Sequence, residues 1–190
     1  MQLTTLRSAT ALQHQKLEKE LDLLRPSFTR DHYATLLKRF YGFHLPWESK
    51  VAAALETELP HFFNARKKLR NLEADLRYLG SATEDLSDIA ICDDLPPLHN
   101  IGSVLGSVYV IEGSSLGGRI LTRHFSEQLG IRPDAGCRYF SGYGDCTGQM
   151  WSAFAELMAL RPQRENDEMV AAADSTFALM GDWLGCKGNG

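Results

Sequence analysis

The sequence lacks an excess of basic charge, a long apolar run and the signature of a secreted protein. Its 190 residues carry 20 Lys and Arg against 24 Asp and Glu, for a formal net charge of −4. A nucleic-acid binder needs an electropositive surface, which this balance does not supply. No apolar stretch is long enough to cross a bilayer, and residues 1–20 contain no signal-peptide core. We therefore expect a cytoplasmic protein without nucleic-acid or membrane partners.

The sequence also lacks regular cysteine spacing and the alternation of apolar and polar residues that marks strands. Cys92, Cys137, Cys146 and Cys186 lie far apart and form neither a C-x-x-C pair nor a zinc-like pattern. We interpret them as free structural thiols. With 44% hydrophobic residues and no linker or repeat, the chain is expected to form one all-α domain over residues 1–190.

Apolar residues recur at helical spacing along most of the chain. Thr5 is placed to cap a first helix that stops before Pro26, and Thr29 to cap a second. Pro46 lies inside the second helix and is expected to kink or divide it, because proline lacks the N–H of the helix ladder.

Further along, Pro60 is expected to open a third helix that ends at Gly80. Residues 81–97 read as an acidic loop, and a long helix after Pro97 is expected to end at Gly130. Two more helices are predicted near residues 147–160 and 165–184.

The predicted long helix contains the segment YVIEGSSLGGRIL, residues 109–121, with Gly113, Gly117 and Gly118 in its interior. Each interior glycine costs roughly 0.5–1 kcal/mol relative to alanine, so the cluster needs a physical reason. On a helical projection, glycines form one stripe and serines a second stripe beside it: Gly102, Gly106, Gly113, Gly117 and Ser103, Ser107, Ser114.

Two explanations account for the stripes. In the first, small residues let a neighbouring helix approach closely. In the second, a flat ligand lies on bare backbone beside a row of hydroxyls. The consecutive pair Gly117 and Gly118 favours the second explanation, because it weakens the helix locally and creates a point at which the helix can bend.

A flat ligand directs attention to macrocycles, and hence to an iron ligand. The chain has six histidines, of which His14 interrupts the apolar stripe of the first helix. A buried imidazole at that position needs either a hydrogen-bond partner or a metal. The residue pattern alone does not choose between these two roles.

The segment LRSATALQHQKLEKE, residues 6–20, resembles the L-[KR]-x-A-T-x-x-x-H-x-x-x-E signature of heme oxygenases. YVIEGSSLGGRIL resembles the distal helix of the same family, especially the bacterial members that make bilin chromophore for bacteriophytochromes. LRNLEADLRYLG (69–80) and GYGDCTGQMWSAFAELM (142–158) are similar to further family elements. The resemblance therefore spans most of the chain.

The resemblance implies an all-helical fold that holds heme between the first helix and the kinked, glycine-bearing helix. His14 would be the proximal iron ligand and Arg7 would pair with a heme propionate. Gly113, Gly117 and Gly118 would let the distal backbone lie against the porphyrin.

In the family, heme is both cofactor and substrate, and the reaction takes O2 and electrons from an external reductase, such as a ferredoxin or a flavoprotein. Its products are biliverdin, carbon monoxide and ferrous iron. The resemblance to the bilin-supplying members adds a bacteriophytochrome as a possible acceptor of the biliverdin.

One position departs from many family members. Where they carry an aspartate directly after the first distal glycine, this sequence has Ser114. A serine hydroxyl can hold a water, but it lacks the charge of a carboxylate. Nearby, Glu112 is expected to pair with an arginine, and Arg119 and Arg123 are candidates for steering an acidic redox partner.

Three alternatives share this helical architecture or pocket. A di-iron oxygenase needs a Glu-x-x-His motif on each of two helices, and the chain has one, from Glu58 to His61, interrupted by Pro60. A thiamin-degrading enzyme would need a cysteine nucleophile with a recognisable partner, which is not evident. A non-catalytic heme carrier or sensor would use His14 and the same pocket, and turnover with a reductant distinguishes it from an oxygenase.

Overall fold

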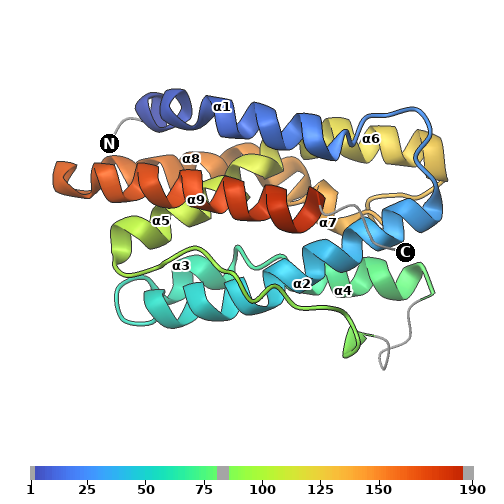
Figure 1. Cartoon of the computed structure of the whole chain (residues 1–190), viewed down its shortest axis with the longest axis horizontal. Coiled ribbons are helices and arrows are strands. Elements are labelled where there is room, and N and C mark those ends of the chain that lie inside the picture. The colour runs from blue at the N-terminus through green and yellow to red at the C-terminus, as the bar shows by residue number, and fades with distance from the viewer. Residues whose placement is uncertain (1–2, 81–85, 186–190) are drawn as a thin grey trace.

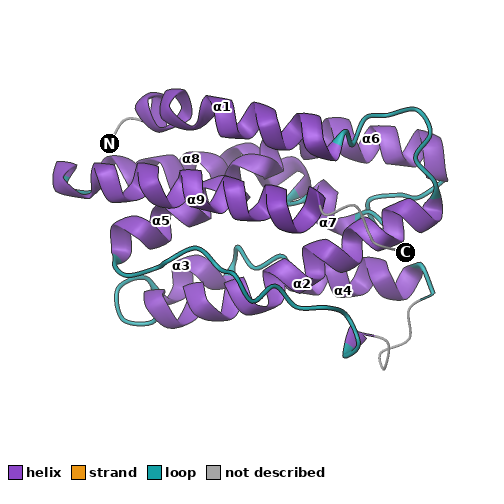
Figure 2. Ribbon diagram, in the orientation of Figure 1, coloured by secondary structure: helices purple, strands orange, loops and turns teal. Residues whose placement is uncertain are grey.

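The computed structural model describes residues 3–80 and 86–185, and within these ranges it contains helices and no β-strand (Figures 1 and 2). The α-helices are α1 (Leu3–Leu21), α2 (Arg30–Leu55), α3 (Pro60–Asn64), α4 (Leu69–Tyr78), α5 (Ile101–Ser114), α6 (Gly118–Leu129), α7 (Arg138–Ser141), α8 (Thr147–Ala159) and α9 (Asn166–Gly185). The predicted all-α class is confirmed.

The helices pack around one core. In Figure 1, α1 runs along one edge of the molecule and α2, α3 and α4 lie at the opposite edge, with α5, α8 and α9 between them. The principal packing pairs are α5 with α9, α9 with α1, and α2 with α4. The largest side chains at the centre are Trp47, Tyr33, Phe43, Phe125 and Phe154, all fully buried. Helix α1 is attached mainly through α9, and its fully buried residues are Leu6 and Thr10.

Several helix ends lie where the sequence predicts them. The Thr29 hydroxyl accepts a hydrogen bond from the backbone N–H of His32 at 3.2 Å and caps α2. Gly130 follows α6 with φ of 66°, a left-handed conformation that glycine adopts readily. The prediction for Thr5 is wrong, because Thr5 already lies inside α1, two residues after Leu3, the first residue of this helix that the structure describes.

Helix α2 continues through Pro46 without a division. The proline leaves the carbonyl of Gly42 without its usual helical partner, and the backbone N–H of Cys92 donates to that carbonyl at 3.0 Å. This approach requires glycine, since a Cβ on Gly42 would lie 2.1 Å from the carbonyl oxygen of Ala90. The loop therefore satisfies the group that proline exposes, and the predicted division does not occur.

The predicted third helix is two helices, α3 and α4, separated by residues 65–68. The side chain of Glu48 on α2 stabilises the start of α4, because its Oε1 accepts hydrogen bonds from the backbone N–H groups of Lys68 at 2.6 Å and Leu69 at 2.9 Å. This carboxylate caps α4 from another helix, where it also faces the positive end of the helix dipole. Of the predicted loop 81–97, residues 86–97 contain no α-helix, and residues 81–85 lie outside the described ranges.

The predicted long helix is also interrupted. It begins at Ile101, where Asn100 and Ser103 form a reciprocal capping box, and α5 ends at Ser114. Residues Ser115–Gly117 form a single 3-10 turn, here called the distal turn, before α6 begins at Gly118. The sequence predicts a weak point in the helix at the glycine pair, and the α-helix gives way to a 3-10 turn at that place.

At the other end of α5, glycines serve close helix packing. A Cβ on Gly106 would lie 2.2 Å from the carbonyl oxygen of Met169 in α9, and a Cβ on Gly102 would lie 2.9 Å from a carboxylate oxygen of Glu168. These contacts are too short for any side chain at Gly106 without separation of the two backbones. For this half of the stripe, the packing explanation is correct.

We expect Gly106→Ala to destabilise the fold by about 1–3 kcal/mol, because the added methyl would push α9 away from α5 and open the core. Chemical denaturation followed by far-UV circular dichroism measures the change. Gly117→Ala is the matched control, since its Cβ would meet no atom within 4 Å. Equal midpoints for the two variants would contradict the packing role of Gly106.

Candidate functional site

His14 is accessible on α1, with 51% of its side chain exposed. Its ring lies edge-on to Phe177 of α9, with the ring centroids 5.7 Å apart, and its Nδ1 is 3.5 Å from an oxygen of Glu18. The expectation that this imidazole is buried is therefore wrong, because α1 covers the core with only a narrow part of its surface. Phe177 and Glu18 contact the ring while leaving much of it open to a ligand.

The glycines around the distal turn differ from those that face α9. A Cβ on Gly117 would meet nothing within 4 Å, and a Cβ on Gly113 would only touch the ring of Trp151, at 3.9 Å. A Cβ on Gly118, in contrast, would lie 2.2 Å from the carbonyl oxygen of Phe140. Gly113 and Gly117 thus present bare backbone to open space, while Gly118 packs the start of α6 against α7.

The distal turn and the first turn of α6 also expose large apolar side chains. Leu116 is 50% exposed and Ile120 is 64% exposed. On a helical projection both fall on the side of Gly113 and Gly117. Apolar side chains beside bare backbone form a surface suited to a flat, apolar ligand.

Arg7 is exposed on α1 and lies near the phenol of Tyr109 on α5. Burial raises the pKa of Tyr109, while a hydrogen bond with Thr10 and the charge of Arg7 lower it. The ring of Tyr109 lies 6.0 Å from that of Trp151. These contacts bring α1, α5 and α8 together beside the glycine surface.

The serine stripe does not line one ligand surface, contrary to the expectation. Ser103 caps α5, and the Ser107 hydroxyl accepts hydrogen bonds from Trp47 Nε1 at 2.8 Å and from the Thr176 hydroxyl at 2.9 Å inside the core. Ser114 is exposed, and its hydroxyl donates to the carbonyl of Ile111 at 2.8 Å. Ser114 alone of these serines is accessible to a ligand, and its oxygen can still accept a hydrogen bond.

Behind the distal turn lies a group of buried charged and polar side chains that sequence reasoning did not find as a group. Glu112 is paired with Arg66, as the expected arginine partner, and accepts a hydrogen bond from the Tyr143 hydroxyl at 2.6 Å. Lys68 Nζ lies 3.5 Å from Glu112 and 3.1 Å from the Ser115 hydroxyl. We call Arg66, Lys68 and Glu112 the buried charge cluster, which the half-buried Tyr143 contacts. Its only sequence signal is Glu112 beside the glycines, because Arg66 and Lys68 stand in ARKKLR, a run typical of an exposed helix surface.

The remaining predicted charges and alternative sites are placed elsewhere. Arg119 is exposed, and Arg123 donates to Glu127 on its own helix at 2.8 Å. Among the described residues, no three His, Cys, Asp or Glu side chains gather as a metal cluster would require. No helix in the described part of the chain has the length and apolar character needed to span a membrane.

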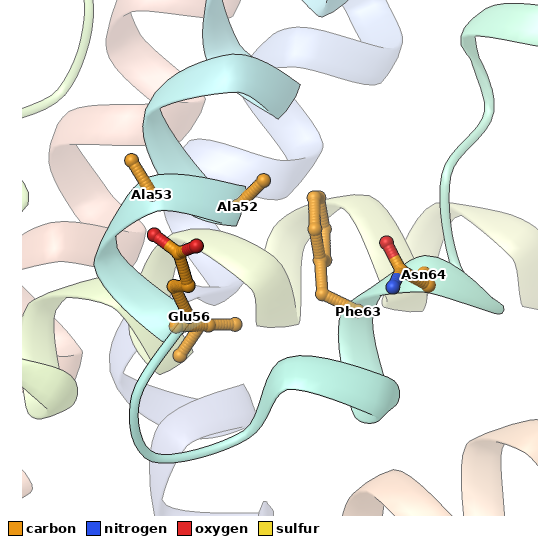
Figure 3. Close-up of a pocket in the computed structure, with 6 residues that line it drawn as sticks. Ala52, Ala53, Glu56, Phe63 and Asn64 are labelled. Atoms are coloured by element: carbon orange, nitrogen blue, oxygen red, sulfur yellow. The ribbon is translucent and has the colours of Figure 1, made fainter.

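A pocket of about 350 Å³ lies between the end of α2 and α3. Figure 3 shows Ala52 and Ala53 of α2, and Glu56 just after its end, beside Phe63 and Asn64 of α3. It contains none of the residues predicted to bind a ligand, so it is separate from the surface around His14 and the distal turn.

Comparison with known proteins identifies the family. The model of the family described as heme oxygenase matches residues 2–185. A heme oxygenase of Xanthomonas campestris pv. campestris is 28% identical over 151 residues, covering 78% of this chain and 86% of the relative.

Solved structures agree with the sequence match. The NO- and CO-bound heme oxygenase from Neisseria meningitidis has a TM-score of 0.72 at 20% identity, covering 98% of this chain and 94% of the other. Heme oxygenase from Leptospira interrogans has a TM-score of 0.76 at 18% identity, covering 97% and 99%. Heme oxygenase-1 from Synechocystis sp. PCC6803, in complex with heme, has a TM-score of 0.75 at 16% identity, covering 97% and 91%. The resemblance to heme oxygenases is confirmed, and the chain belongs to the heme oxygenase family of enzymes.

Proposed function

We propose that this protein is a heme oxygenase that binds heme between α1 and the surface formed by Gly113 and Gly117. The open glycine surface carries the proposal: two of the interior glycines have no packing role, and they lie beside exposed apolar side chains. Support also comes from the family match and from the accessible histidine on α1. Bound heme supplies both the iron at which O2 reacts and the ring that is opened to biliverdin, carbon monoxide and ferrous iron.

His14 is the residue proposed to hold the iron. Its Nδ1 is directed toward Glu18, at 3.5 Å, which leaves Nε2 as the nitrogen suited to a metal. The carboxylate of Glu18 would orient the ring and support the basicity of the ligating nitrogen. Phe177, edge-on to the same ring, limits its rotation.

Gly113 and Gly117 are proposed to let the backbone lie against the ring of the substrate. Leu116 and Ile120 would cover its apolar surface and exclude water. Gly118 has a supporting role, because its contact with Phe140 fixes the start of α6. The exposed Ser114 can hold one water by hydrogen bonding, as a source of protons on this side.

Arg7 is proposed to pair with a propionate. It is exposed on the same helix as His14, one residue after the buried Leu6, and its charge reaches the phenol of Tyr109. A guanidinium at this position can bind a carboxylate with two parallel hydrogen bonds. The pairing would orient the ligand without contributing to the chemistry.

The wider setting is proposed on the resemblance. Residues 1–190 would act as one cytoplasmic domain. Electrons would come from a ferredoxin or a flavoprotein reductase, for which Arg119 is an exposed cation that could steer an acidic partner. A bacteriophytochrome would be an acceptor of the biliverdin.

The test adds equimolar hemin to the purified protein and follows the visible spectrum, then supplies a reductase system and O2 with catalase present. We expect a Soret band that forms and then decays into a bilin absorption. A Soret band that persists after reduction and exposure to O2 would indicate a heme carrier or sensor, with Ser114 the first residue to examine. Failure to form a Soret band would overturn the heme site itself.

A further inference from the structure

Lys68 places a buried ammonium group directly behind the distal turn. The side chain is 4% exposed. Its Nζ donates to the Ser115 hydroxyl at 3.1 Å, lies 3.5 Å from Glu112 and sits 3.7 Å from the centre of the Tyr143 ring. The group thus contacts the last part of α5, the first residue of the distal turn and the segment before α8.

The surroundings of this ammonium hold it in one place. Burial lowers the pKa of Lys68, and the facing carboxylate of Glu112 raises it. The same carboxylate binds Arg66 and the Tyr143 hydroxyl, so its oxygens are also fixed. At its own backbone, Lys68 is held by Glu48, whose Oε1 accepts from its N–H at 2.6 Å.

The distal turn needs support from this side. On its open side, Gly117 has no neighbour within 4 Å of a Cβ position and Leu116 is half exposed. On the helical projection Ser115 points away from Gly113 and Gly117, toward the interior of the protein. The hydrogen bond from Lys68 therefore joins the turn to the α3–α4 connection, 47 residues earlier in the chain.

A buried ion pair adds little net stability compared with well-packed apolar groups, whereas its hydrogen bonds favour one geometry. We propose that Lys68 is a positioning residue. Through its hydrogen bond to Ser115, it holds the distal turn in the position that leaves room for heme over Gly113 and Gly117. This inference rests on the proposed function. It concerns the geometry of the turn and assigns Lys68 no contact with the substrate.

The experiment compares Lys68→Met with Lys67→Met, its exposed neighbour. Hydrogen exchange of the backbone amides of residues 115–119 is measured in the protein without heme, and hemin affinity is measured by Soret titration. A hydrogen bond to a charged group corresponds to roughly a 10-fold or larger effect. We expect Lys68→Met to speed exchange at the turn and weaken hemin binding by about that factor, with Lys67→Met like the parent.

Ser115→Ala tests the same contact from the other partner and serves if Lys68→Met fails to fold. Because Lys68 is inferred to act through Ser115, the double variant should show little more effect than either single variant. Additive effects, or parental exchange and affinity in both single variants, would overturn the inference. A lower melting temperature with faster exchange throughout the protein would assign Lys68 a general structural role instead.

The two proposals can fail separately. If the parent protein does not bind hemin, the proposed function is wrong, while the exchange measurement on residues 115–119 still reports whether Lys68 holds the turn. If the parent binds hemin and Lys68→Met changes neither exchange nor affinity, only the positioning role is wrong.

Discussion

His14→Ala is expected to abolish heme turnover while leaving the helical fold intact. Loss of a residue that merely supports a metal ligand typically costs about 10–100-fold in affinity or activity, so loss of the ligand itself should cost more. The fold should change little, because the side chain is 51% exposed and substitutions at such positions usually stay within about 0.5 kcal/mol. Bilin formation, the Soret spectrum and far-UV circular dichroism provide the measurements.

His61→Ala is the matched control, since His61 is an exposed histidine on α3, away from α1, and should turn over heme like the parent. Added imidazole gives a second control, because it can occupy the space left at residue 14 and restore an axial nitrogen. If His14→Ala degrades heme at the parental rate, the assignment of the iron ligand is wrong.

Gly117→Leu should impair heme binding without weakening the protein. The backbone of Gly117 has φ of −79° and ψ of −11°, which any residue can adopt. Leucine is also the better helix former, so the free energy of unfolding should stay the same or rise by up to about 1 kcal/mol. Its side chain would project from the surface where we place the substrate, and crowding of about 1–3 kcal/mol corresponds to roughly 5- to 150-fold weaker binding.

Soret titration and denaturation of the same samples separate the two effects. Gly106→Ala should behave in the opposite way, with reduced stability and, once folded, little change in hemin affinity, because its contact is with α9. Parental affinity and an unchanged product for Gly117→Leu would mean that the open glycine surface does not face heme.

Much of the fold could be predicted from local pattern. Helical spacing located most of the helices, and Thr29 and Gly130 marked ends that the structure confirms. Two of the errors, the division at Pro46 and the single third helix, arose where a distant residue supplied a hydrogen bond. The N–H of Cys92 donates to the carbonyl that Pro46 leaves without a partner, and the carboxylate of Glu48 caps the start of α4. No window of sequence contains both partners of such a contact.

The site shows the same division. The motif singled out His14 and the glycines as candidates, but the sequence could not separate Gly113 and Gly117, which are open, from Gly106 and Gly118, which pack against backbone. The sequence shows all four as glycines inside a predicted helix. They are distinguished by whether backbone from α7 or α9 lies against them. Lys68 was missed for a related reason. It stands next to Lys67, a cation of the same type that is exposed, and the sequence does not show which of the two is buried.

The shallow attachment of α1 has a consequence for the catalytic cycle. This helix of 19 residues buries only Leu6 and Thr10 completely and rests mainly on α9. A substrate bound between α1 and the distal turn would complete the core on that side, and it would act as a folding ligand for the helix that binds it. Ring opening would then remove the support that the substrate adds to the packing of α1 on α9. Turnover itself would loosen the site, and release of the product would be coupled to the chemistry that forms it.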